Sequence, residues 1–160
     1  MDVLTPRGQE SRKWEDRAIQ LWSSHYKSMT FIHTPKEKPA AIDGIIIKDQ
    51  RIIGVVETKA RPSFTLEEFK SKHDMQWLVT KEKVDKCLLV AEILSVPFIG
   101  FLYMPQDDLL LYRSLWNPKS GWLVDIKFMK TKTQATINGG VAWRENAFID
   151  MRTAKILGQT

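Results

Sequence analysis

AAIDGIIIKDQRIIGVVETKARP, residues 40 to 62, carries the clearest strand signals of the sequence. Two runs rich in isoleucine and valine are joined by a short polar segment, and each run contains an acidic residue, Asp43 in the first and Glu57 in the second. β-Branched residues favour strands, so the two runs predict a hairpin with strands near 41–48 and 52–60. A buried charge is costly unless it is paired or binds a metal, so both carboxylates are candidate functional groups.

The register of this hairpin determines whether the two carboxylates meet. A two-residue loop would set Asp43 opposite Val56, on the wrong side from Glu57. A three-residue loop over residues 49–51 sets Asp43 directly opposite Glu57, and β-carbons of such neighbours are about 4.5–5.5 Å apart. Two carboxylates at that separation repel strongly without a cation, and their oxygens are the ligands that Mg²⁺ prefers. Lys59 shares a face with Glu57 because residues i and i+2 of a strand point the same way.

Asp43 followed by Glu57-Thr58-Lys59 on the next strand resembles the core of the PD-(D/E)XK nuclease superfamily, which includes restriction endonucleases and archaeal Holliday-junction resolvases. The resemblance implies that Asp43 and Glu57 hold Mg²⁺, with Mn²⁺ as a substitute. The carbonyl of Thr58 would be a further ligand. Lys59 would orient or activate the attacking water, or neutralise charge that develops on the phosphate. Ile42 precedes Asp43, where the family motif has a proline.

A helix that carries a glutamate commonly precedes the hairpin in that superfamily, and Glu15 occupies this place in the sequence. The resemblance therefore makes Glu15 a catalytic candidate, and the competing interpretation is a salt bridge on the helix surface with Arg12. The order of elements matches the superfamily over about residues 9–113. We therefore expect one nuclease domain over residues 1–160, with a restriction-endonuclease-like core and a basic C-terminal extension over 114–160.

The remaining elements follow from local patterns. Apolar residues at helical spacing predict helices over 9–27 and 79–95, and Thr65 followed by Glu68 is a capping box that opens another helix. The order α-β-β-α-β-β predicts an α/β fold with a mixed central β-sheet flanked by helices. Other expected segments are a loop over 30–39, strands at 96–104, 109–113 and 122–130, a turn at 137–140, and a short strand with a helix or loop over 141–157.

Composition limits the classes of function. The net charge is +5, and residues 127–160 carry six basic and two acidic side chains, which suits a polyanion such as nucleic acid. A solvated charged surface explains the same charge equally well. The single cysteine, Cys87, excludes a disulfide framework and a cysteine zinc site, and we expect it in the core. The longest apolar stretch, 93–104, is too short to cross a bilayer. We expect a soluble cytoplasmic protein of a bacterium or a phage-infected cell, with no membrane partner.

Five further residues are candidate DNA contacts. Lys72 and Gln76 follow the hairpin closely enough to touch the scissile phosphate, although both also suit solvent-facing positions on a helix. Lys130, Lys132 and Gln134 alternate along one stretch and could follow a phosphate backbone on one strand face. An edge strand protected from aggregation by lysines would have the same pattern.

Together these patterns predict a Mg²⁺-dependent DNA endonuclease of the homing, resolvase-like or restriction-like kind. Cutting both strands with so small a domain favours a homodimer or homotetramer, with apolar residues around Trp116–Val124 as a contact surface. The alternatives are an exonuclease and a nucleic-acid-binding protein that keeps the fold without catalysis. Affinity for a divalent metal separates the last alternative from the others, since simple binding needs no ion.

Overall fold

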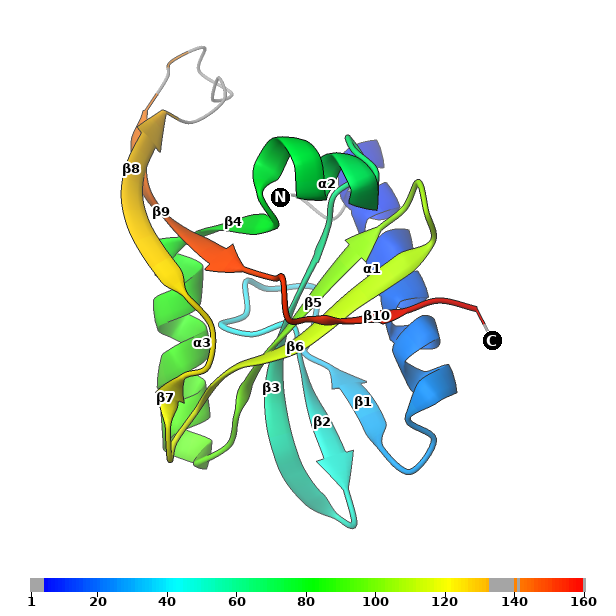
Figure 1. The fold of residues 1–160 in the computed structure, drawn as a ribbon. Coiled ribbons are helices and arrows are strands. Elements are labelled where there is room, and N and C mark those ends of the chain that lie inside the picture. Colours follow the sequence, from blue (N-terminus) through cyan, green and yellow to red (C-terminus); the bar gives the residue numbers. More distant parts are fainter. Residues whose placement is uncertain (1–4, 133–139, 141, 160) are drawn as a thin grey trace.

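The computed structural model describes residues 5–132, 140 and 142–159, and it is a mixed α/β fold (Figure 1). The central sheet has the strand order β1-β2-β3-β5-β6-β10, with β7 paired to β6, and a second sheet has the order β4-β9-β8. β3 and β5 are parallel and their neighbours are antiparallel, so the predicted mixed sheet flanked by helices is confirmed. The elements are α1 (Pro6–His25), β1 (Thr30–His33), β2 (Gly44–Lys48), β3 (Arg51–Ala60), α2 (Leu66–His73), β4 (Gln76–Thr80), α3 (Lys81–Leu94), β5 (Phe98–Met104), β6 (Leu109–Asn117), β7 (Gly121–Trp122), β8 (Ile126–Lys132), β9 (Trp143–Asp150) and β10 (Lys155–Leu157).

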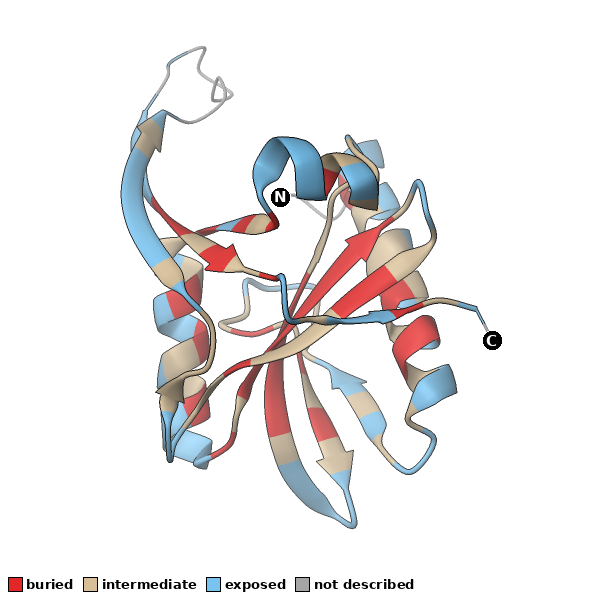
Figure 2. Ribbon diagram, in the orientation of Figure 1, coloured by how far each residue is buried: buried red, intermediate tan, exposed pale blue. Residues whose placement is uncertain are grey.

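The central sheet is covered on both faces. Successive residues of a strand point to opposite faces, and in β3 Val56 packs toward Trp22 of α1 while Val55 packs toward Val84 of α3 and Trp77 of the second sheet. All seven residues of β5 are buried, which explains why its sequence is a continuous apolar run (Figure 2). The helices are buried only along the sides that face the sheet.

The hairpin between β2 and β3 differs from the expected three-residue loop. Its loop has two residues, Asp49 and Gln50, and both have a positive φ, 50° and 63°. Such conformations match the twist of a two-residue hairpin. A β-bulge then leaves Ile53 as an extra residue in β3, so that Gly44 faces Val56. The bulge shifts the pairing by one residue and places Asp43, the residue before Gly44, beside Glu57. The predicted pairing is therefore reached through a two-residue loop and a bulge instead of a three-residue loop.

The other local elements agree with the sequence predictions in part. The capping box at Thr65 and Glu68 is present and begins α2, and Cys87 is fully buried as expected. The predicted loop over 30–39 is wrong at its start, where β1 forms, and β4 was not predicted. Residues 141–157 supply β9 and β10 with no helix in their described part. The predicted turn at 137–140 lies outside the described residues except for Gly140.

The C-terminal residues are part of the fold. β9 pairs with β4, and β10 pairs with β6 in the central sheet. Ala147, Ile149 and Met151 are fully buried in the same core as α3. This part of the chain therefore fills the core on the α3 side of the central sheet. None of the helices in the described ranges is long and apolar enough to span a membrane.

Candidate active site

Asp43 and Glu57 lie side by side where β2 begins. The backbone N–H of Asp43 donates to the Val56 carbonyl at 3.0 Å, and the Thr58 N–H donates to Asp43 Oδ2 at 2.8 Å. Glu57 is only 1% exposed, and its Oε1 accepts no hydrogen bond from the described residues. Lys59 Nζ lies 3.3 Å from that Oε1. The structure thus gathers the acidic pair and the lysine of the sequence motif.

A second lysine, which sequence reasoning missed, contacts both carboxylates. Lys83 on α3 places its Nζ 3.2 Å from Glu57 Oε2 and 3.7 Å from Asp43 Oδ1, and it donates to the Ala40 carbonyl at 3.2 Å. The sequence held a signal for it: Lys83 lies four residues before Cys87, so the two share one face of the helix. Because Cys87 was expected in the core, a lysine one turn earlier had to reach an anion or the surface.

Glu15 reaches the site through another lysine. Glu15 Oε2 is 2.9 Å from Lys36 Nζ, and that Nζ is 3.9 Å from Asp43 Oδ1. Both side chains line a pocket of about 480 Å³ together with Asp43, Lys59 and Lys83. The predicted competitor, an ion pair between Glu15 and Arg12, does not occur in the described structure, although Arg12 lines the same pocket. Three carboxylates and three lysines therefore meet within one site.

The two central carboxylates ionise differently. Burial raises the pKa of Glu57 to about 7, and the charge of Asp43 adds to this effect against the opposing Lys59 and Lys83. Burial alone would also raise the pKa of Asp43, but the charge of Lys83 and the Thr58 N–H outweigh it and lower the pKa. Asp43 is therefore the anion of the pair near neutral pH, and Glu57 is close to its titration point.

The donor set fits a hard cation. Mg²⁺ is usually held by one or two carboxylates, with waters and substrate phosphates completing its shell. Asp43 and Glu57 supply two carboxylates, and the buried Oε1 of Glu57 has no hydrogen bond. The Thr58 carbonyl points to the same edge of β3 as the Thr58 N–H that meets Asp43, because both groups of an extended residue face one side. Within the described residues no cluster of three or more His, Cys, Asp or Glu forms a metal site, since Lys36 stands between Glu15 and Asp43.

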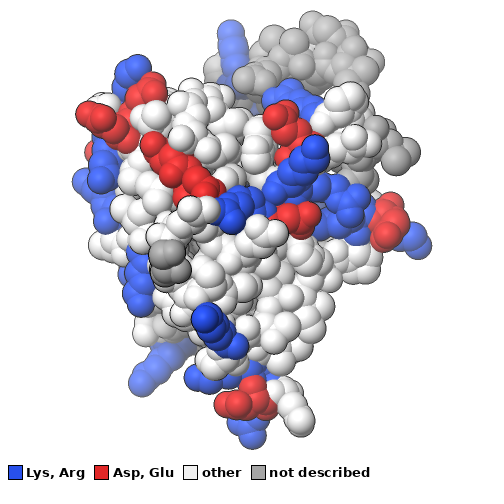
Figure 3. Space-filling model, turned by 90° about the vertical axis from the view of Figure 1, so that its right-hand side faces the viewer, with Lys and Arg blue, Asp and Glu red and all other residues white. Residues whose placement is uncertain are grey.

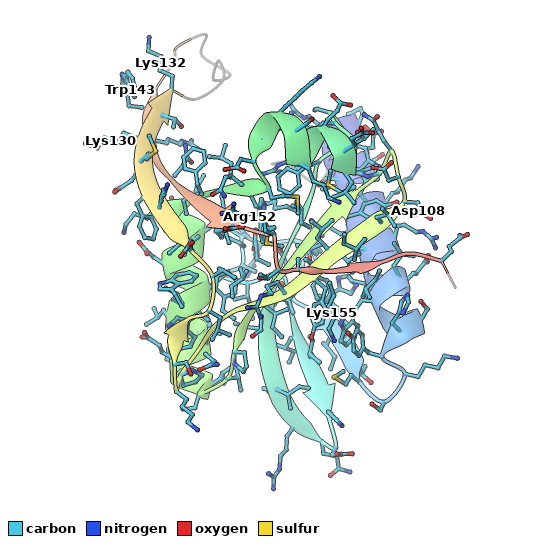
Figure 4. The ribbon with its side chains drawn as sticks, in the orientation of Figure 1. Asp108, Lys130, Lys132, Trp143, Arg152 and Lys155 are labelled. Atoms are coloured by element: carbon cyan, nitrogen blue, oxygen red, sulfur yellow. The ribbon has the colours of Figure 1, made fainter. Side chains whose placement is uncertain are left out.

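The predicted DNA contacts are not gathered at this pocket. Lys72 is exposed and paired within α2, and Gln76 lies at the start of β4 rather than on a helix. Lys130 and Lys132 lie on the far part of β8, away from the central sheet (Figure 4). Gln134 lies outside the described residues. On the face shown in Figure 3, basic and acidic side chains alternate and neither sign forms a large patch.

Comparison with known proteins finds similarity to solved structures. No family model matches the chain, and no curated protein matches it. The chain is similar to the solved structure of Archaeoglobus fulgidus Hjc, a Holliday junction resolvase from an archaeal hyperthermophile. The identity is 12% and the TM-score is 0.47, over 88% of this chain and 93% of that one.

Proposed function

We propose that the chain is a Mg²⁺-dependent endonuclease that hydrolyses phosphodiester bonds in DNA. The observation that carries the proposal is the pairing of Asp43 with a buried Glu57 whose Oε1 has no hydrogen-bond partner among the described residues, next to Lys59. A carboxylate pair with an adjacent lysine, open to a pocket, suits metal-assisted hydrolysis of a phosphate ester. A buried carboxylate oxygen that Lys59 approaches to 3.3 Å without a hydrogen bond is unusual in a purely structural ion pair.

Each residue of the site then has a definable task. Asp43 and Glu57 would hold the ion, with the Thr58 carbonyl as a further ligand. When bound, Mg²⁺ polarises the phosphate and lowers the pKa of its water. The side chain of Lys59 is 43% exposed, and its ammonium can donate to a phosphate oxygen or orient the attacking water. Lys83 neutralises the two carboxylates when no divalent cation is present, which keeps them close together.

The outer residues would bind and position DNA. Lys130 and Lys132 on β8 supply positive charge away from the pocket, and contacts of this kind account for sequence-independent affinity. Concerted cutting of both strands would need two copies of the site, so we propose a homodimer or homotetramer. Trp116 and Trp122 pack against the core of the same chain, and the contact between copies is therefore not assigned to them. A homing or resolvase-like enzyme is our preferred type over an exonuclease.

The test is cleavage of supercoiled, linear, branched and single-stranded DNA in Mg²⁺ or in EDTA. We expect Mg²⁺-dependent nicking or cutting, and its loss in Asp43→Asn and Lys59→Ala. Lys48→Ala is the matched control, because Lys48 is exposed at the far end of β2. Cleavage that continues unchanged in Asp43→Asn and Lys59→Ala would rule out this site as the catalytic centre.

One observation favours a protein that binds DNA without cutting it. The three lysines already neutralise Glu15, Asp43 and Glu57, so the site is electrically balanced without a metal. This second candidate predicts DNA binding that is the same in Mg²⁺ and in EDTA, with no cleavage of any substrate. Degradation that starts only from DNA ends would instead identify an exonuclease.

A further inference from the structure

A second pocket adjoins the candidate active site. Its volume is about 750 Å³, and it lies between α1, the end of β3, and the strands β4 and β9. Ser11, Lys59 and Lys83 line both pockets, so the two are neighbours that meet at these side chains. Four residues of its lining are basic and one is acidic. The basic residues are Arg7, Lys59, Arg61 and Lys83, and the acidic residue is Glu10.

Arg61 is the unusual member of this lining. It follows β3 two residues after Lys59, and its guanidinium donates to the Ala60 carbonyl at 3.1 Å and to the Leu78 carbonyl at 2.6 Å. Neither partner carries a charge. None of the ion pairs among the described residues involves Arg61, and burial lowers its pKa while the charge of Glu57 opposes this effect. A half-buried cation without an ion pair is costly, and an incoming anion would recover part of that cost.

Other arginines of the fold show the contrast. Arg17 holds both carboxylate oxygens of Asp108, and Arg152 does the same with Asp150. Figure 4 labels Asp108 and Arg152, and both pairs lie away from the β8 lysines. These guanidinium groups already have the bidentate partner that their geometry favours. Arg61 has the same fork and no carboxylate to fill it in the part of the chain that the structure describes.

The spacing along β3 relates Arg61 to the catalytic candidates. Residues 57, 59 and 61 project from one face, and residues two apart on a strand are about 6.6 Å apart. This step is comparable with the distance between neighbouring phosphates of one nucleic-acid strand. The half-buried Trp14 and the apolar Leu78 line the same pocket and offer surfaces to a sugar or a base.

We infer that the second pocket binds the phosphodiester next to the one that is cleaved, on the same strand, with the Arg61 guanidinium as its bidentate donor. The inference rests on the proposed function, since it names the substrate position beside that site. Lys59 lies between the site of the cleaved phosphodiester and the site of its neighbour, because it lines both pockets. The recognised group is one backbone phosphodiester of a single strand. Every DNA strand has this group, so the recognition does not depend on the base sequence.

The test is a phosphate-by-phosphate binding scan in EDTA, read by fluorescence anisotropy on DNA that the wild type binds. Each probe carries one neutral methylphosphonate at a different position. At one position we expect the methylphosphonate to weaken binding by the wild type about tenfold. Arg61→Gln should bind unmodified DNA about tenfold more weakly than the wild type does, and a methylphosphonate at that position should weaken its binding no further. Arg51→Gln, at the exposed tip of the hairpin, is the control and should match the wild type.

Two variants keep the outcome clear. Arg61→Lys retains the charge without the fork, and its affinity should fall between those of the wild type and Arg61→Gln, with all three proteins unfolding at similar temperatures. If Arg61→Gln and the wild type lose the same affinity at every methylphosphonate position, the inference is wrong. The scan needs no metal, so its result is independent of the cleavage test in Mg²⁺. A position-specific effect in the scan, with no cleavage in Mg²⁺, would support the phosphate-binding pocket and refute the nuclease proposal. Cleavage in Mg²⁺, with no position-specific effect in the scan, would support the nuclease proposal and refute the pocket.

Discussion

Glu57 should make the metal-free protein less stable as the pH rises from 4.5 to about 7. In the folded protein its pKa is about 7, against the ordinary 4.5 expected in the unfolded chain. The folded state therefore binds this proton more tightly, so the full contribution is present below pH 4.5 and is lost as the pH rises through 7. A difference of about 2.5 pH units at 1.36 kcal/mol per unit gives about 3 kcal/mol.

Glu57→Gln removes the titration and keeps the size of the side chain. We expect urea unfolding in EDTA, measured from pH 4.5 to 8, to show that the free energy of unfolding falls by about 3 kcal/mol more in the wild type than in the variant. The other ionisable groups are common to both proteins, so their contributions cancel in the difference. Glu67→Gln is the matched control at an exposed position of α2. Parallel curves for the wild type and Glu57→Gln between pH 5 and 7 would mean that Glu57 is already ionised at pH 5, which refutes the reasoning.

Three further outcomes follow from the same site. Mg²⁺ at a hundredfold excess over its Kd should stabilise the wild type by about 3 kcal/mol in thermal unfolding, and Asp43→Asn should lose that effect. Lys83→Met should lower the free energy of unfolding by up to about 3 kcal/mol at pH 8, because it leaves the buried Glu57 with Lys59 but without Lys83, and by much less at pH 5, where the carboxyl takes up a proton. Glu15→Gln keeps a hydrogen-bond acceptor for Lys36, so it should slow cleavage at limiting Mg²⁺ and leave the unfolding temperature nearly unchanged; full activity would reject a role for Glu15 in the reaction.

The hairpin and the helices could be predicted because their signals are local. Apolar runs and a capping box act within a few residues, and they define these elements whatever the rest of the chain does. β1 and β4 carry no such signal, since each is four or five residues long and forms only against a partner elsewhere in the chain. β1 and β4 were not predicted because they depend on pairing with distant strands, and the periodicity of the sequence does not reveal that pairing.

The register of the hairpin depends on contacts that lie beyond it. A β-carbon on Gly54, the residue after the bulged Ile53, would lie 2.5 Å from the side chain of Ile99 on β5. The close approach of β5 at this point therefore needs a glycine, and the bulge sits beside it. The register could not be inferred from the loop length alone, because a two-residue loop followed by a bulge gives the same pairing as a three-residue loop. The site was predictable as two carboxylates and Lys59, whereas Lys36 and Lys83 were not predictable, because they come from separate elements.

The two carboxylates contribute opposite terms to the stability of the folded protein. The surroundings of Asp43, two lysines and the Thr58 N–H, favour its charge, whereas the surroundings of Glu57 disfavour charge on it. A divalent cation bound as proposed would gain most from Glu57, because it would replace a burial cost with a bond to an oxygen that accepts no hydrogen bond from the described residues. A proton gains from the same oxygens, so protons and metal ions would compete there below about pH 7. Lys83 is the third competitor, and it holds the carboxylates close enough together for either of the others to replace it.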